Sequence, residues 1–450
     1  MGRVLGMVLA VTAAAGYAGC ADAPARQGLT DDELVAQLRA IPGVTVDEAT
    51  TLTPDYRYYV LHVTQPIDHD DPGRGTFQQE VSLLHRDTLE DVPVVIQTSG
   101  YADDNLDTPV ELTELLAANQ VSIEHRYYGA SMPEPCDWTR LTIWQMAEDE
   151  HAIIAALRAI YGGAFVSTGG SKGGMTAIFH RRFHPDDVAG TVAYVAPLSF
   201  GAPDPRYAAF IADVGEVGCH TLVRDAATEM LAHRRPQMEL RAAHQPGYAY
   251  SQIELGAAVE AAILGLEWSF WQFHGIAECP TVPLTSASDD ELFAFLDAVS
   301  PIHDNDDDHV AHAQPYYYQS YSQLGYPDRG TTYLAPFVQY GDDDYINQLP
   351  TQAPSYDPTA MHDIDDYVEH HGDHLLFIYG QWDPWTAGGF RPGSAADTAV
   401  LVQAQGTHSS WITTLERSAR DAAFAKLAAW TGVTPMASRV RRGIDHADRK

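Results

Sequence analysis

The stretch FVSTGGSKGGMTAIFHRRF, residues 165–183, places one serine, Ser171, between paired glycines where an apolar run gives way to an amphipathic one. The first run predicts a buried strand, and the second predicts a helix that turns Met175, Ile178 and Phe179 inward. Glycines at this junction permit a backbone turn that side chains would obstruct. Such a turn can cradle a phosphate, serve only as a tight connection, or hold a nucleophile on a sharp elbow.

The residues after the serine separate these interpretations. A phosphate-binding Walker loop requires Gly-Lys followed by Ser or Thr, but Lys172 follows Ser171 and precedes Gly173. Residues 169–173 instead match Gly-x-Ser-x-Gly, the pattern of a nucleophile elbow between a strand and a helix. The pattern alone is weak, so a structural turn stays the alternative unless the chain also supplies a base and an acid.

A serine nucleophile needs a histidine to take its proton and a carboxylate to orient that histidine. On an α/β-hydrolase sheet the acid and then the histidine follow the serine, each beyond the carboxyl end of a strand. The strand-like run LLFIYG leads to Asp383, and the run AVLVQAQG leads to His408. Either residue alone could be a turn former or a helix-start residue. Together, in this order, they predict a triad of Ser171, Asp383 and His408.

An oxyanion hole requires backbone N–H groups aimed at the carbonyl oxygen under attack. The N–H of Lys172, directly after the nucleophile, is the expected first donor. The run VVIQTSGYADD offers Gly100 and Tyr101 at an earlier strand end, and we favour the N–H of Tyr101 as the second donor. We expect the side chain of Lys172 to face solvent or an acid, because only its amide is required.

The order of the predicted elements indicates an α/β-hydrolase fold with a large, mostly helical inserted cap. Strand-like and helical runs alternate before the insertion and again after it. The expected division is a signal peptide (1–20), a tether and short helix (21–44), the first part of the core (45–199), the helical cap (200–370), the second part of the core (371–434) and a tail (435–450).

The first twenty residues have the character of an export signal. Arg3 precedes an apolar stretch that is too short to span a bilayer. The ending Tyr17-Ala18-Gly19-Cys20 resembles a bacterial lipobox, with Tyr17 where an aliphatic residue is usual. We therefore expect an exported protein with Cys20 lipidated, anchored to the membrane through that lipid or otherwise periplasmic or extracellular.

The chain carries a formal net charge of -34 over 450 residues. Nucleic acid and anionic membrane surfaces would be repelled, so neither is expected as a charge-driven partner. A solubilising or salt-adapted surface explains the charge most simply. An acidic field also attracts cationic ligands, such as the free N-termini of peptides.

The cysteines other than Cys20 are Cys136, Cys219 and Cys279. Export implies an oxidising compartment, where two of the three can pair and one stays free. No two cysteines have Cys-x-x-Cys spacing, so the sequence does not support a zinc or a redox site.

Two acidic and histidine-rich segments could suggest a metal. HDNDDDHVAH (303–312) has calcium-loop spacing, but His309 occupies the position that needs glycine, so we expect a solvated loop. EHHGDH (369–374) lies before a strand and lacks zincin spacing. We therefore predict neither a metal nor another cofactor.

Five segments together resemble the secreted bacterial prolyl tri/tetrapeptidyl aminopeptidases, over about residues 50 to 430. Two shorter motifs, EHRYYG and QPIDH, are also similar to the related lysosomal Pro-Xaa carboxypeptidases. The resemblance implies a capped α/β-hydrolase that removes short peptides from free N-termini, with proline favoured before the scissile bond. The five segments are GTFQQEVSLLHRD, IEHRYYGASMPEP, LTIWQMAEDEH, STGGSKGGMTAIFHRRFHPDDVAGTVAYVAP and YGQWDPW.

The resemblance also carries residue roles. The family's triad falls on Ser171, Asp383 and His408, although GTHSSW departs from the glycine expected after the histidine. The segments GCHTLV and AECPTVP resemble the family's cap, which implies a Cys219–Cys279 disulfide and leaves Cys136 free.

Peptide substrates call for an ammonium site and a proline pocket. Glu124 is a candidate for the ammonium, with a buried pairing to Arg126 as the alternative. Trp268 and Trp271 are candidates for the proline pocket, although aromatic residues at helical spacing are more often plain core.

Two other functions compete with a peptidase. A secreted esterase or lipase would use the same triad, but the HGGG-type oxyanion loop of many such enzymes is absent from this sequence. A non-catalytic surface binding protein would typically have lost a member of the triad, and all three are present.

Overall fold

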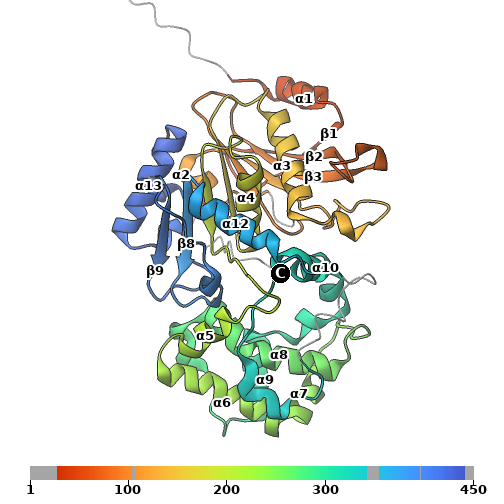
Figure 1. Ribbon diagram of the computed structural model, residues 1–450, viewed down its shortest axis with the longest axis vertical. Coiled ribbons are helices and arrows are strands. Elements are labelled where there is room, and N and C mark those ends of the chain that lie inside the picture. Colours follow the sequence, from red (N-terminus) through yellow and green to blue (C-terminus); the bar gives the residue numbers. More distant parts are fainter. Residues whose placement is uncertain (1–27, 104–106, 342–353, 396, 441–450) are drawn as a thin grey trace, which may run out of the picture.

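The computed structural model describes residues 28–103, 107–341, 354–395 and 397–440 (Figure 1). The expected signal peptide, with Cys20, and residues 441–450 of the expected tail lie outside these ranges. Within them, no helix is both long enough and apolar enough to cross a membrane.

The core is a nine-stranded sheet with the order β1-β2-β3-β5-β4-β6-β7-β8-β9. The pairs β1–β2, β2–β3 and β3–β5 are antiparallel, and every pair from β5 to β9 is parallel. The carboxyl ends of the parallel strands therefore share one edge. The strands are β1 Val44–Ala49, β2 Arg57–Pro66, β3 Thr76–His85, β4 Val94–Thr98, β5 Asn119–Ile123, β6 Phe165–Gly170, β7 Thr191–Tyr194, β8 Leu375–Gly380 and β9 Ala399–Gln403.

Helices cover both faces of this sheet, because alternate strand residues point to opposite sides. Val94 and Ile96 pack with α1 and α3, whereas Val95 packs with α2 and its neighbours on the other face. Helices α4 and α12 extend the first layer, and α13 extends the second (Figure 1). This arrangement is the expected α/β-hydrolase fold. The helices are α1 Asp31–Ala40, α2 Glu111–Leu116, α3 Ile143–Leu157, α4 Lys172–Phe183, α12 Thr359–His370 and α13 Arg417–Thr431.

A helical cap with a hydrophobic core of its own lies between β7 and β8 in the chain and forms the lower lobe of Figure 1. Its core includes Met230 of α6, Leu266 of α8 and Leu296 of α9, all buried. The described elements between β7 and α12 are the α-helices α5 Arg206–Asp213, α6 Val217–His233, α7 Arg235–Ala242, α8 Leu255–Ser269, α9 Asp289–Val299 and α10 Asp307–Gln319, the short π-helices η3 Phe270–His274 and η6 Ser320–Leu324, and the 3-10 helices η4 Ile276–Thr281, η5 Ile302–Asn305 and η7 Thr331–Phe337.

The packing of α12 bears on where the insertion ends, which the sequence placed at residue 370. Met361, Ile364 and Val368 of α12 join the same buried cluster as Phe179 of α4, so α12 packs in the helical layer of the sheet. We therefore propose that the cap ends before residue 359.

The prediction of a solvated loop at 303–312 is wrong, because this segment is helical. Asp306 accepts a hydrogen bond from the N–H of His309 at 2.9 Å and caps the start of α10. A carboxylate that caps a helix in this way satisfies one of its first N–H groups. The acidic run is therefore explained by the helix start.

Candidate active site

Ser171 lies at the junction of β6 and α4 with φ 53° and ψ −124°, a conformation that residues with side chains rarely adopt. Its N–H donates to the carbonyl of Tyr194 at 2.8 Å. A Cβ on Gly169 would lie 2.4 Å from the carbonyl oxygen of Gly173, so the strand and the helix approach too closely for any side chain there. The glycines thus form a strained elbow that carries Ser171 at the carboxyl edge of the sheet.

The acid and the base predicted from the sequence come together at the same edge. Asp383 follows β8 and His408 follows β9, the parallel neighbour of β8. Asp383 Oδ2 lies 2.7 Å from His408 Nδ1, and the two residues are 0% and 6% exposed. The second carboxylate oxygen accepts from the N–H of Trp385 at 3.1 Å, which fixes its plane.

The free nitrogen of this histidine has the character of a general base. His408 Nε2 is buried and has no hydrogen-bond partner among the residues that the structure describes. A carboxylate on Nδ1 favours the tautomer with its proton on Nδ1, which leaves the lone pair on Nε2. The pair can therefore accept a proton from a serine hydroxyl presented by the strand β6, two positions along the sheet from β8.

The cap reaches this histidine directly, which the sequence did not reveal. The backbone N–H of His408 donates to the carbonyl of Gln272 in η3 at 2.7 Å. The ring of Phe273, also in η3, meets the imidazole edge-on at 5.9 Å between centroids and is 37% exposed. Phe273 therefore offers open apolar surface beside the base. Only its position in the aromatic run WSFWQF, at the end of α8 and in η3, could have suggested it.

The predicted oxyanion donors lie on two segments that touch. Lys172 is the first residue of α4, and a Cβ on Gly100 would lie 2.6 Å from the backbone nitrogen of Gly173. The N–H of Tyr101 donates to Ser99 Oγ at 3.2 Å, the long end of the range for hydrogen bonds. An oxyanion would compete with Ser99 for that donor. The N–H of Gly100, the weaker candidate in the sequence, donates to no acceptor among the described residues.

The expectation that the Lys172 side chain faces solvent is wrong, whereas the alternative that it faces an acid has support from the charge of the nearby Glu150. The residue is 3% exposed, and its Nζ donates to the carbonyl of Gly100. It lies over the rings of Tyr101 and Tyr128, at 5.2 and 5.4 Å from their centroids. Burial lowers its pKa to about 7, although the nearby Glu150 acts in the opposite direction.

Glu124 is buried inside the core domain and does not face open space. Its Oε1 accepts from the N–H and the hydroxyl of Ser131, both at 2.8 Å, and its Oε2 accepts from the N–H of Asp103 at 3.0 Å. The alternative pairing with Arg126 is also wrong, because Arg126 binds the carboxylate of Asp149 at 2.6 and 2.8 Å. Glu124 therefore connects the segments of Asp103 and Ser131 through hydrogen bonds, and it is poorly suited to bind a substrate ammonium.

The two candidate tryptophans differ in position. Trp271 is fully buried in the hydrophobic core of the cap, so the alternative of plain core applies to it and the proline-pocket role does not. Trp268 donates to Gln272 Oε1 at 3.0 Å and packs edge-on against Trp385, with centroids 5.1 Å apart. Trp268 therefore packs against Trp385 and helps to hold it in place beside the site.

The pairing that the resemblance implied for the cysteines is confirmed. Cys219 at the start of α6 and Cys279 in η4 form a disulfide, with their Cα atoms 5.6 Å apart. Cys136 is free and exposed. The bridge joins α6 to the segment that directly follows η3, the part of the cap that contacts His408.

Possible metal ligands gather at two places in the described ranges, His151 with His184 and Asp187, and three residues of the 303–312 segment. The rings of His151 and His184 stack in nearly parallel planes 4.0 Å apart, so their in-plane lone pairs do not converge on one ion. His151 instead bonds Asp187, and His184 bonds Glu148, each at 2.7 Å. We assign neither group to a metal.

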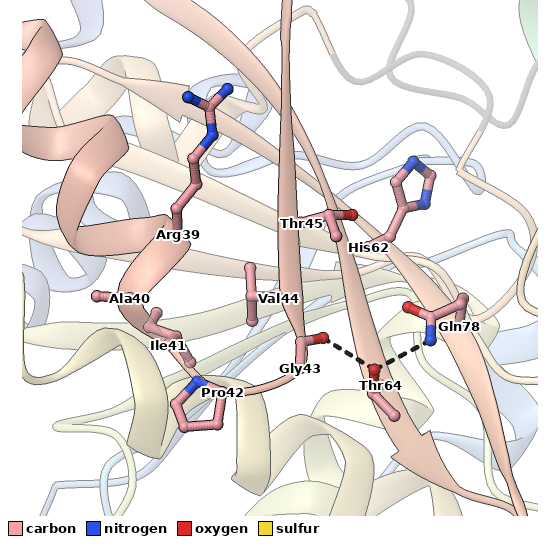
Figure 2. Close-up of a pocket in the computed structure, with 10 residues that line it drawn as sticks. All are labelled: Arg39, Ala40, Ile41, Pro42, Gly43, Val44, Thr45, His62, Thr64 and Gln78. Atoms are coloured by element: carbon pink, nitrogen blue, oxygen red, sulfur yellow. Dashed lines mark hydrogen bonds between the residues drawn. The ribbon is translucent and has the colours of Figure 1, made fainter.

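A surface depression lies at the opposite end of the sheet, between the end of α1 and strands β1 and β2 (Figure 2). Thr64 Oγ1 donates to the carbonyl of Gly43 at 2.9 Å and accepts from Gln78 Nε2 at 3.0 Å across its floor. Because β1 is the strand farthest from β9, this depression is no part of the triad site.

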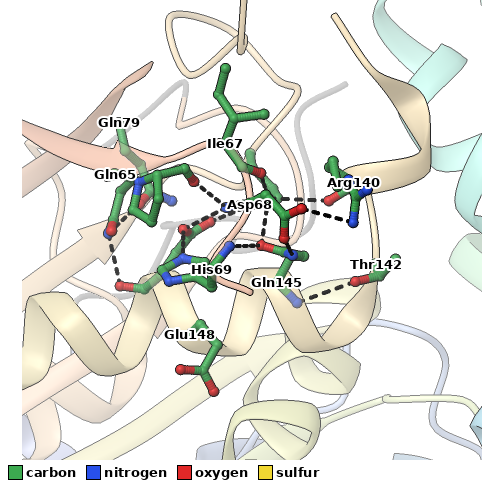
Figure 3. Close-up of polar contacts among 12 residues, drawn as sticks. Gln65, Ile67, Asp68, His69, Gln79, Arg140, Thr142, Gln145 and Glu148 are labelled. Atoms are coloured by element: carbon green, nitrogen blue, oxygen red, sulfur yellow. Dashed lines mark hydrogen bonds and ion pairs between the residues drawn. The ribbon is translucent and has the colours of Figure 1, made fainter. Parts of the chain in front are cut away.

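The QPIDH motif, similar to a carboxypeptidase motif, lies in a cluster of buried polar groups beside α3 (Figure 3). Asp68 accepts from Gln145 Nε2 at 2.8 Å and pairs with Arg140 at 3.0 Å. The N–H of His69 donates to Gln145 Oε1 at 2.9 Å. These bonds fasten the end of β2 to α3, so we interpret the motif as structural.

Known peptidases are similar to this chain over nearly its whole length. The family described as PS-10 peptidase S37 matches residues 17–445. The prolyl tri/tetrapeptidyl aminopeptidase of Streptomyces mobaraensis is 37% identical over 450 residues, covering 97% of this chain and 94% of that protein. The lysosomal Pro-X carboxypeptidase of Bos taurus is 29% identical over 160 residues, 32% of each chain. Among solved structures, the proline iminopeptidase of Mycobacterium smegmatis has a TM-score of 0.36 and 13% identity, over 85% of this chain and 98% of that one.

Proposed function

This chain belongs to the PS-10 peptidase S37 family and is a serine peptidase, and from that premise we propose that it releases tri- and tetrapeptides from free N-termini by cutting after proline. The observation that carries the proposal is the buried Asp383–His408 pair, 2.7 Å apart, at the sheet edge where the strained elbow holds Ser171. The similarity to an aminopeptidase of this specificity, over nearly the full length of both chains, supports the substrate class.

The residues at this edge account for each step of peptide hydrolysis. His408 Nε2 takes the hydroxyl proton while Ser171 Oγ bonds to the carbonyl carbon, and Asp383 stabilises the imidazolium. The N–H of Lys172 and a second N–H from residues 100–101 donate to the oxyanion. The C–N bond then breaks, and His408 returns its proton to the leaving amine. Water hydrolyses the acyl-enzyme and releases the short peptide with a new carboxylate.

The inserted cap explains why such a triad would act only near an N-terminus. An insertion after β7 lies over the carboxyl ends of the strands, where ligands bind in open α/β sheets. Contacts from η3 to His408 show that this part of the cap reaches the reacting groups. A cap that closes one end of the cleft limits the number of residues before the cut, and a carboxylate there would bind the peptide ammonium.

We expect a free N-terminus to matter strongly for the rate. A tripeptidyl chromogenic substrate with proline before the cut should exceed its N-acetylated twin by at least ~10-fold in kcat/KM, because acetylation removes the cation and would leave the carboxylate that we propose for the closed end unpaired. Parallel assays of both peptides and of a chromogenic ester measure this. Equal rates on the two peptides, or efficient cleavage within the loops of a folded protein, would contradict an exopeptidase while leaving the serine peptidase assignment intact.

We also propose export, with Cys20 as the lipidated first residue of the mature protein. The support is the charged, apolar and small-residue pattern of residues 1–20. Fractionation of a producing bacterium should find the wild type with the membranes and Cys20→Ser as a soluble exported form. An unmodified mature N-terminus at another residue, seen by mass spectrometry, would contradict lipidation but not export.

A further inference from the structure

A buried ammonium directly follows the nucleophile, and the reaction scheme above uses only its amide. Lys172 is 3% exposed, and a lysine so placed loses its hydration unless polar groups replace the water. The replacements here are the carbonyl of Gly100 and the faces of Tyr101 and Tyr128. The carbonyl is the one hydrogen-bond acceptor recorded for Nζ among the described residues.

That carbonyl belongs to the peptide group that links Gly100 to Tyr101. A peptide group is planar, so the direction of the Gly100 C=O also fixes the direction of the Tyr101 N–H. The same turn cannot shift toward the elbow, because Gly100 (φ 76°) already lies against the backbone of Gly173. The side chain of Lys172 therefore ties the turn after β4 to the first turn of the nucleophile helix.

We propose that Lys172 is a positioning residue, whose ammonium holds the 100–101 peptide group in the orientation that completes the oxyanion hole. This inference rests on the proposed serine peptidase function of the same site. It assigns to the side chain after the nucleophile a role separate from that of its amide. Nζ itself touches neither the substrate nor the reacting atoms.

The groups around Nζ decide when this ammonium keeps its proton. Burial lowers the pKa of Lys172 to about 7, and the carboxyl of Glu150 on α3 opposes that fall. Burial in turn raises the pKa of Glu150 well above its ordinary value, and the neighbouring Asp149 adds to the rise. His125, after β5, is kept neutral because burial and the charge of Lys172 hold its pKa well below the usual value. Below pH 7 the bond to Gly100 is charge-assisted. As pH rises through about 7 the charge is lost and the bond weakens.

The first test replaces the ammonium by an apolar chain of similar length. Lys172→Met should lower kcat about 100-fold or more, with KM changed by less than ~3-fold, as for loss of an oxyanion donor. Thermal unfolding and circular dichroism establish that the variant is folded. A folded Lys172→Met enzyme with wild-type kcat would overturn the proposal. If Ser171→Ala also kept full activity, the proposed function itself would fail.

The second test leaves Lys172 in place and does not depend on that variant folding. The wild-type kcat/KM should fall as pH rises through about 7. The same limb should appear in kcat at saturating substrate, because kcat reports groups of the enzyme–substrate complex and not the amino group of the free peptide. A wild-type kcat that does not fall above pH 7 would overturn the role of the ammonium.

Discussion

Ser171→Ala should lower kcat by about 10⁴- to 10⁶-fold on a tripeptidyl substrate with proline before the cut. The substitution removes the only atom that bonds to substrate carbon, while the strained elbow keeps the same backbone because alanine differs from serine by one oxygen. Folding should therefore be unchanged, and a residual rate should remain from binding and the oxyanion donors. Single-turnover assays with high enzyme concentration, together with thermal unfolding, measure both quantities.

A matched serine elsewhere controls for the change of residue type. Ser438 is exposed near the end of the described chain, and Ser438→Ala should leave kcat and KM unaltered. Wild-type turnover by Ser171→Ala would refute the nucleophile. Loss of folding in Ser171→Ala but not in Ser438→Ala would show that the elbow needs the hydroxyl for stability.

Asp383→Asn should lower kcat by about 10⁴-fold without unfolding the protein. The carboxylate accepts from Nδ1 of His408 at 2.7 Å, and this bond keeps the proton on Nδ1. An asparagine amide would instead donate to Nδ1 and place the proton on Nε2, which then cannot accept the proton of Ser171. The defect should appear in kcat far more than in KM, because the substrate is not touched by this residue.

Asp373 provides the control for this change, because it is an aspartate of the segment just before β8. Its side chain is 51% exposed and accepts from the N–H of His374 at 2.9 Å. Asp373→Asn should stay within ~3-fold of the wild type in kcat. A severe loss in Asp373→Asn, with Asp383→Asn active, would mean that the wrong acid has been assigned.

The contact between the cap and the base has a consequence for how the two domains act together. His408 is held on one side by Asp383 of the core and on the other by the Gln272 carbonyl of the cap. Cys279, one end of the Cys219–Cys279 bridge, lies seven residues after Gln272 in the chain. Cap position and the orientation of the base are therefore linked through a short, cross-linked segment.

Short-range patterns in the sequence were sufficient for the framework and for the positions of the three candidate triad residues at one edge of the sheet. Thr30 forms a reciprocal capping box with Glu33 at the start of α1, which depends only on residues three apart in the sequence. The order of Ser171, Asp383 and His408 was informative because parallel strands bring their carboxyl ends to one edge whatever the length of the insertion between them. Both features follow from local geometry or from chain order.

Contacts between distant residues were decided only by the tertiary structure. Lys172 meets the Gly100 carbonyl across 72 positions, and Arg126 chooses Asp149 across 23, although Glu124 is two residues away. Trp271 lies in the core of the cap, and the apolar face of α12 packs in the helical layer of the sheet. An apolar pattern predicts that each is buried, but only the packing of the folded chain determines against which apolar surface. The sequence pattern indicates that a side chain must be buried or hydrogen-bonded, whereas the folded chain determines which residue lies close enough to contact it.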